Sequence, residues 1–213
     1  MPNKYNMRYE LEFLITSYCQ ASCPTCLRTL LIKQDNFRPK HTSVEKIKKV
    51  IPYLDKDYII SLCGETGDPL MHPKIDEIID LFLENDNWVQ IHTNGGLRNI
   101  DFYKKYAKDR RVSISWGIDG MDAKTNSKYR VGVDFSKAWK FMNTWFELGG
   151  KGHWNFIIFE WNKHQYKDAF YYAKEHNIPI EIKINNRINP IETSGYVGHY
   201  EYKKIREQLN DLK

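Results

Sequence analysis

The chain has 213 residues, of which 41% are hydrophobic and 28% charged, a composition that predicts a single globular domain over residues 1–213. The formal net charge of +5 is mild and dispersed, whereas a nucleic-acid-binding domain usually shows a dense basic stripe. No apolar run is long enough to cross a bilayer and residues 1–9 lack the apolar core of a signal peptide, so we expect a cytoplasmic protein with reduced thiols and no membrane partner.

Strand-like apolar runs alternate with helix-like periodicities six times, without a linker or a break in composition. The predicted strands are residues 11–16, 58–63, 88–92, 112–118, 153–159 and 179–184. The predicted helices are residues 44–54, 75–83, 99–108, 134–148, 162–176 and about 198–211. Pro52 is expected to end or kink the first helix, and residues 28–41 are expected to form a polar loop.

This alternation predicts an α/β fold with right-handed crossovers and a parallel sheet. We interpret it as a partial (β/α)6 TIM-like barrel capped by the C-terminal helix. The glycine pattern Gly-x-Gly-x-x-Gly does not follow the first predicted strand, which disfavours a dinucleotide-binding site.

Three of the four cysteines follow the first predicted strand at the spacing Cys-x3-Cys-x2-Cys. A loop this short can bring Cys19, Cys23 and Cys26 to one face of a metal centre. Because a fourth cysteine at matching spacing is missing, a four-iron cluster held here would keep one iron open to a small molecule. The alternative is a zinc site with a distant fourth ligand, such as Cys63 or a histidine, although Cys63 is expected to be a buried strand residue.

Polar residues also follow the next three predicted strands at the point where each strand ends. These residues are Gly67, Asp68, Thr93, Asn94 and Asp119. In parallel barrels the chemistry lies at the C-terminal ends of the strands, so these residues and the cysteines predict one site at one rim. The alternative is that they only form turns, in which Gly, Asp and Asn are common. His72 and His92 flank the predicted site and are expected to be structural histidines.

The segment ITSYCQASCPTCLRT, followed by the strand-end residues in order, resembles the radical S-adenosylmethionine superfamily. The resemblance implies that Cys19, Cys23 and Cys26 hold a [4Fe–4S] cluster and that the methionine end of S-adenosylmethionine chelates the open iron. The reduced cluster would pass one electron to the sulfonium, releasing methionine and a 5′-deoxyadenosyl radical that abstracts hydrogen from a substrate. Such chemistry belongs to the cofactor, which the protein mainly positions and shields.

Two segments are similar to family motifs around the methionine end of the cofactor. Residues 66–73 resemble the Gly-Gly-Glu-Pro loop with Asp68 in place of Glu, and residues 63–65 are a rival alignment. Backbone carbonyls and a carboxylate in such a loop can accept hydrogen bonds from the methionine ammonium. Residues 91–95 are similar to the Thr-Asn-Gly end of the family's third strand.

Two later segments and one position of the cysteine loop extend the resemblance. Residues 116–120 resemble the family's Ser-x-Asp-Gly turn with Gly117 in place of serine, and residues 129–132 resemble a segment whose arginine pairs with the methionine carboxylate. Thr25 stands where an aromatic residue often lies near the adenine. The resemblance therefore implies a cofactor-binding set of Thr25, Gly67, Asp68, Thr93, Asn94, Asp119 and Arg130.

The partners of such an enzyme would be a flavodoxin- or ferredoxin-like one-electron donor and a substrate, which the sequence leaves open among small metabolites, peptides and nucleotides. Substrate specificity is expected from residues 28–41 and 185–200, because no later cysteine cluster marks an auxiliary domain. A second hypothesis is a non-catalytic iron–sulfur or zinc protein on the same barrel. A third is a version of the enzyme that contacts nucleic acid through the basic residues Arg28, Lys33, Arg38 and Lys40.

Overall fold

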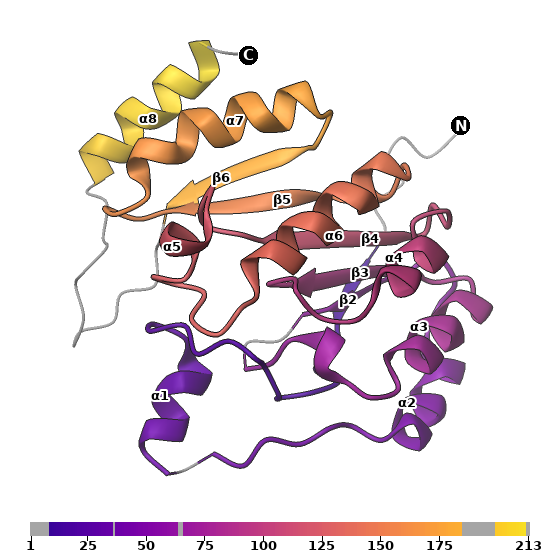
Figure 1. The fold of residues 1–213 in the computed structure, drawn as a ribbon. Coiled ribbons are helices and arrows are strands. Elements are labelled where there is room, and N and C mark those ends of the chain that lie inside the picture. The colour runs from indigo at the N-terminus through magenta and orange to yellow at the C-terminus, as the bar shows by residue number, and fades with distance from the viewer. Residues whose placement is uncertain (1–8, 36, 64–65, 185–198, 212–213) are drawn as a thin grey trace.

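The computed structural model describes residues 9–35, 37–63, 66–184 and 199–211. Its strands form one six-stranded sheet in the order β1-β2-β3-β4-β5-β6, with every neighbouring pair parallel (Figure 1). The strands are β1 (Glu10–Glu12), β2 (Ile59–Leu62), β3 (Trp88–Thr93), β4 (Val112–Gly117), β5 (Lys151–Ile158) and β6 (Ile180–Ile184). The predicted α/β class and the partial (β/α)6 barrel are confirmed.

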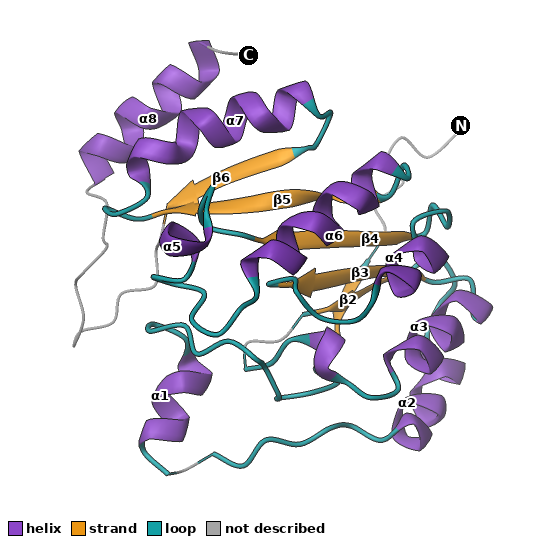
Figure 2. Ribbon diagram, viewed as in Figure 1, coloured by secondary structure: helices purple, strands orange, loops and turns teal. Residues whose placement is uncertain are grey.

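Helices follow the strands along the chain, and most of them cover one face of the sheet, whereas α1 and α5 lie toward the carboxyl ends of the strands (Figure 2). They are α1 (Leu27–Lys33), α2 (Val44–Val50), α3 (Ile75–Glu84), α4 (Ile100–Tyr106), α5 (Ala123–Asn126), α6 (Phe135–Glu147), α7 (Tyr166–Glu175) and α8 (His199–Asp211). Short 3-10 turns lie at Ile51–Tyr53, Pro69–Met71 and Lys163–Gln165. In the part of the chain that the structure describes, no helix has both the length and the apolar character needed to cross a membrane.

The two faces of the sheet differ in chemistry because successive side chains of a strand point to opposite faces. In β4, Ile114 and Trp116 are fully buried toward the helices, and Trp116 lies against Tyr103 of α4. Many of the alternate residues of the strands are small or polar. They share the opposite face, here called the inner face, and include Ser61, His92, Ser115, His153, Asn155, Glu181 and Lys183.

Strand β1 ends at Glu12, four residues before the predicted end of the first strand. The amide of Phe13 makes the last bond toward β2, to the Ser61 carbonyl at 2.9 Å. The chain then leaves the sheet and pairs with residues 40–42 instead, in an antiparallel bridge between Thr16 and His41. The apolar run over residues 11–16 therefore pairs with two different segments. Its first part joins the parallel sheet beside β2, and its last part pairs with residues 40–42.

The predicted polar loop over residues 28–41 contains a helix, so that prediction was wrong. Helix α1 begins directly after Cys26 and buries none of its residues, although Leu27 and Ile32 are large and apolar. Such a helix makes no buried stripe and leaves no clear period in the sequence. The prediction for Pro52 was correct, since α2 ends at Val50 and a 3-10 turn carries the proline.

The C-terminal helix α8 agrees with the predicted bounds of about 198–211. It buries Ile205 and Leu209, and the Tyr166 hydroxyl of α7 donates a hydrogen bond to Gln208 (Figure 1). The segment 185–198, which belongs to the predicted specificity region, lies outside the described residues, as do residues 64–65 of the rival loop alignment.

Candidate functional site

The carboxyl ends of β2 to β6 meet at a cavity of about 490 Å³. This volume is in the range of sites that hold small molecules or cofactors. Five members of the predicted cofactor-binding set line the cavity, namely Gly67, Asp68, Thr93, Asn94 and Arg130. The expectation that the polar strand-end residues gather at one rim is therefore correct for the residues after β2 and at the end of β3, whereas Asp119, after β4, does not line the cavity.

The cysteine loop runs past the carboxyl ends of β2 and β3. Cys23 is buried in a small apolar cluster with Ala21, Tyr129 and Phe159, while Cys19 and Cys26 are half-buried at its edge. Cys26 immediately precedes α1. Within the described residues, no three His, Cys, Asp or Glu side chains converge on a point that could hold a single metal ion.

Two N–H groups point at the sulfur of Cys19. The backbone amide of Ala21 lies 3.4 Å from this sulfur, and the side-chain nitrogen of Asn94 lies 3.3 Å from it. Burial raises the pKa of the Cys19 thiol to about 12, and the nearby carboxylate of Asp68 acts in the same direction. Asn94 thus joins the end of β3 to the cysteine loop by a direct contact.

Gln20, inside the cysteine motif, makes a second connection to the end of β3. Its side-chain nitrogen donates to the Asn94 side-chain oxygen and, at 2.9 Å, to the Gly95 carbonyl. The sequence analysis did not identify Gln20, because a glutamine between two cysteines carries no signal without its partner. The structure therefore adds Gln20 to the residues that build the site.

The loop after β2 is packed closely against the cysteine loop. A Cβ atom at Gly67 would lie 2.1 Å from the Thr16 carbonyl oxygen, so any side chain at this position would force the two backbones apart. The amide of Asp68 donates to the Tyr18 carbonyl at 2.8 Å. Gly67 is therefore needed for this close approach, whatever it contacts in the cavity.

The carboxylate of Asp68 is almost fully buried and accepts three hydrogen bonds from the protein. The Leu70 amide donates to Oδ1 at 3.0 Å, while the Thr93 hydroxyl and the Asn94 amide donate to Oδ2 at 2.8 and 2.9 Å. Burial raises the pKa of Asp68 to about 6, against the opposite effect of these hydrogen bonds. Asp68 thus fastens the loop after β2 to the end of β3.

Arg130 reaches the cavity from the segment after β4, and Asp119 holds it there. Its Nε donates to Asp119 Oδ2 at 2.6 Å, and the other carboxylate oxygen accepts from the Ile157 amide at 2.8 Å. Burial opposes the charge of Arg130, but the Asp119 carboxylate keeps its pKa above the ordinary value. Asp119 is fully buried and does not line the cavity, so its contribution to a bound ligand would pass through Arg130.

The glycine at position 117, where the family motif has serine, is explained by the same arginine. A Cβ atom at Gly117 would lie 2.8 Å from Nη2 of Arg130. The guanidinium therefore occupies the space that a serine side chain would need. Thr25 lies away from the cavity lining, and its hydroxyl is 3.1 Å from the Tyr129 hydroxyl.

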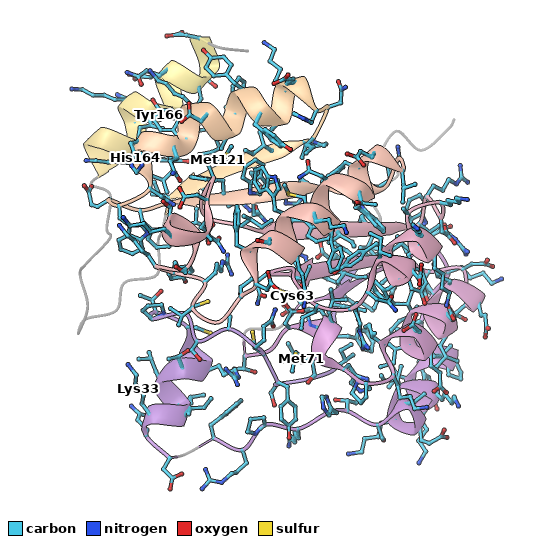
Figure 3. The ribbon with its side chains drawn as sticks, viewed as in Figure 1. Lys33, Cys63, Met71, Met121, His164 and Tyr166 are labelled. Atoms are coloured by element: carbon cyan, nitrogen blue, oxygen red, sulfur yellow. The ribbon has the colours of Figure 1, made fainter. Side chains whose placement is uncertain are left out.

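Several residues that line the cavity were not predicted as site residues. Cys63 at the end of β2 is half-buried and faces the cavity, so the expectation of a buried strand cysteine was wrong (Figure 3). His92 also lines the cavity, with Nε2 3.3 Å from the Ser61 hydroxyl. Asn155 and Lys183 reach it from β5 and β6. The alternation of polar residues in these strands was the available signal.

His72 has the structural role that was predicted for it. It is buried, and its Nδ1 accepts from the Lys74 amide at 3.1 Å, so Nε2 carries the proton and donates to the Thr42 carbonyl at 2.9 Å. Burial lowers the pKa of His72, which agrees with a neutral ring. Both ring nitrogens are thus used within the fold.

The basic residues of the segment 28–41 do not form one free patch. Arg28 donates from Nε to the Ser17 carbonyl at 3.2 Å and from Nη1 to the Ala21 carbonyl at 3.1 Å, so it supports the cysteine loop. Arg38 pairs with Asp35 at 2.9 Å. Lys33 lies on the outer side of α1 (Figure 3). Of these basic residues, Arg28 thus has a structural role, while the Arg38–Asp35 pair is exposed to solvent.

The cysteine loop suits an iron–sulfur cluster by three observations. Its three thiols are the soft ligands that such clusters take. Donors directed at the Cys19 sulfur can stabilise negative charge there. The aromatic rings of Tyr129 and Phe159 cover Cys23. A four-iron cluster takes one thiolate per iron, so its ligands need not converge as the ligands of one zinc ion must.

A family profile described as the radical SAM superfamily matches residues 13–160. No curated protein matches the sequence. Among solved structures, Streptococcus suis SuiB bound to precursor peptide SuiA has a TM-score of 0.80 and 17% identity, over 97% of this chain and 46% of SuiB. Native anSMEcpe with bound AdoMet has a TM-score of 0.74 and 16% identity, over 97% of this chain and 60% of anSMEcpe.

Methylornithine synthase (PylB) is also similar, with a TM-score of 0.60 and 14% identity, over 95% of this chain and 61% of PylB. At these identities the likeness shows a shared fold. The chain spans between about half and three fifths of the length of these three structures.

Proposed function

Because the chain belongs to the radical SAM superfamily, we propose that it binds a [4Fe–4S] cluster through Cys19, Cys23 and Cys26, and S-adenosylmethionine in the adjacent cavity. The observation that carries this proposal is the contact between Asn94, which lines the cavity, and the sulfur of Cys19. It places the thiol loop next to a space of about 490 Å³ at the carboxyl ends of the strands. A cluster on these thiols would therefore lie beside S-adenosylmethionine bound in the cavity.

Within this site, Arg130 would bind the methionine carboxylate. Its Nε is taken by Asp119, and its remaining N–H groups are the donors left for a ligand. The buried Asp119 holds the guanidinium in one position, so that little freedom is lost on binding. Arg130, already paired with Asp119, would thus bind a second carboxylate, that of the ligand. The methionine moiety of S-adenosylmethionine carries such a carboxylate.

The loop of Gly67 and Asp68 would receive the methionine ammonium at its backbone carbonyls, since both residues line the cavity. The Asp68 carboxylate already accepts three hydrogen bonds, so its main role would be to hold this loop against Thr93 and Asn94. Tyr129 and Phe159 would keep water from the cluster at Cys23. One electron from the bound cluster would cleave S-adenosylmethionine into methionine and a 5′-deoxyadenosyl radical, which takes a hydrogen atom from the substrate.

The substrate would lie over the inner face of the sheet. Barrel interiors are usually filled with branched apolar residues, whereas this one presents His92, Asn155 and Lys183 to the cavity. Two solved structures hold peptides, SuiB with its precursor peptide SuiA and anSMEcpe with the Cp18Cys peptide, so peptides are the first class to test. Small metabolites and nucleotides follow. A flavodoxin- or ferredoxin-like protein would donate the electron.

The test is made on protein reconstituted without oxygen. Iron and sulfide per chain are counted, dithionite and S-adenosylmethionine are added, and 5′-deoxyadenosine is measured by chromatography. We expect four irons per chain and formation of 5′-deoxyadenosine. A Cys23→Ala variant should lose the cluster and the product, while Cys63→Ala should keep the cluster. Bound zinc, or a cluster that leaves S-adenosylmethionine intact, would instead indicate the non-catalytic binding protein.

A further inference from the structure

We infer that Asn94 is a positioning residue that acts on the cluster through Cys19, by donating a hydrogen bond to its sulfur and so raising the reduction potential. The inference rests on the proposed function, since it concerns the cluster that Cys19 would help to hold. The side-chain nitrogen of Asn94 lies 3.3 Å from this sulfur, within the range of an N–H···S bond.

The orientation of the Asn94 amide is fixed by its neighbours. An amide nitrogen and oxygen are hard to distinguish by shape, so the assignment must come from the hydrogen-bond network. Gln20 donates to the Gly95 carbonyl at 2.9 Å, and a carbonyl can only accept, so the Gln20 atom at this point is its nitrogen. The same nitrogen faces one end of the Asn94 amide, which must therefore be the oxygen. The other end, directed at Cys19, is the N–H donor.

The backbone holds Asn94 in the same place. Its amide donates to Asp68 Oδ2 at 2.9 Å, and the residue is buried, with 7% of its surface exposed. The Thr93 hydroxyl donates to the same carboxylate oxygen at 2.8 Å. Asn94 is thus fastened at its backbone by Asp68 and at its side chain by Gln20. Hydrogen bonds within the protein therefore direct its donor toward the cysteine loop.

A donor directed at a ligand sulfur favours the reduced cluster. Reduction adds one negative charge, and the positive end of the N–H dipole stabilises the more negative state more strongly. The donor end of the interaction is shielded from water because Asn94 is buried, while Cys19 is half-buried. Removing the donor should therefore make the cluster harder to reduce, so its midpoint potential should fall.

The test is a redox titration of the reconstituted [4Fe–4S] protein without S-adenosylmethionine, followed by electron paramagnetic resonance of the reduced cluster. Asn94→Leu removes the donor at similar volume, and Gln20→Met removes the group that orients it. Asn87→Leu is the matched control. Asn87 is also buried and lies directly before β3, at its other end, where its side chain bonds to Asp55 and Asn85.

We expect Asn94→Leu to lower the equilibrium constant for reduction of the cluster roughly tenfold. For one electron this corresponds to a midpoint potential lower by about 59 mV. Gln20→Met should shift the potential in the same direction by less, and Asn87→Leu should leave it unchanged while lowering stability. If Asn94→Leu fails to fold, the shift in Gln20→Met decides the question. Potentials in both site variants that match Asn87→Leu would overturn the inference. A wild-type chain that assembles no four-iron cluster would instead overturn the proposed function.

Discussion

Replacing Asp68 with asparagine separates two effects of the buried carboxylate, its hydrogen bonds and its charge. The carboxylate is 2% exposed and accepts bonds from Leu70, Thr93 and Asn94. In Asp68→Asn one oxygen becomes an NH2 group, so at least one of the three donors loses its acceptor. That loss costs about 1–3 kcal/mol at any pH. The charge effect, in contrast, depends on pH.

The sign of the charge effect follows from the pKa of Asp68. Burial raises it from 3.8 to about 6 in the folded chain, so between these values the folded state binds more protons than the unfolded state. The stabilisation that Asp68 gives the folded state is thus complete below about pH 4 and is lost as the pH rises through 6. A difference of about two units between the folded and unfolded pKa values corresponds to roughly 3 kcal/mol. The asparagine variant lacks this dependence.

The assay is urea unfolding of the cluster-free chain, for wild type and Asp68→Asn, at several pH values between 4 and 8. We expect the variant to be less stable than wild type by about 1–3 kcal/mol at pH 4. Because wild type then loses roughly 3 kcal/mol relative to the variant by pH 8, the difference should vanish or change sign. Thr93→Val is the control, because it removes one hydrogen bond to the same carboxylate and keeps the charge. A stability difference that stays constant, or grows with pH, would refute the reasoning.

Three further substitutions test the contacts around the cavity. Gly67→Ala places a Cβ 2.1 Å from the Thr16 oxygen. It should lower the melting temperature by at least roughly 2–4 °C and should also lower the iron content. An unchanged melting temperature together with an unchanged iron content would contradict this prediction. Asp119→Asn removes the partner of Arg130 and should weaken S-adenosylmethionine binding at equilibrium, unless the arginine is positioned by other groups. Thr25→Val should leave both iron content and binding unchanged, and reduced binding would return Thr25 to the cofactor site.

The sequence was sufficient for the parts of the fold that depend on periodicity. Local patterns predicted the six alternating strands and helices and the ends of most of them. They also predicted the rim at which Asp68 and Thr93 meet. Strand β1 was overestimated because an apolar run does not show which partner it pairs with, and Thr16 pairs with His41 instead of β2. Helix α1 was missed because it buries no side chain and so leaves no periodic signal.

The same limit applies to the site. Spacing identified the cysteines, but the Gln20–Asn94 pair joins residues 74 positions apart, which no local pattern reveals. Asp119 was predicted at the right strand end, yet only the structure shows that its carboxylate faces Arg130 and Ile157. Cys63 was predicted to be buried because cysteine is usually buried. Its position at the end of β2 instead exposes it to the cavity.

The cysteine loop has little regular structure of its own and depends on the loops that line or adjoin the cavity. It is bonded to the loop after β2 through the Tyr18 carbonyl, to the end of β3 through Gln20, and to the segment after β4 through the Ser22 amide and Val131 carbonyl at 2.8 Å. A ligand that orders these loops would therefore also order the thiols, and a cluster would order the cavity. Since such coupling is reciprocal, each group should bind more tightly when the other is present.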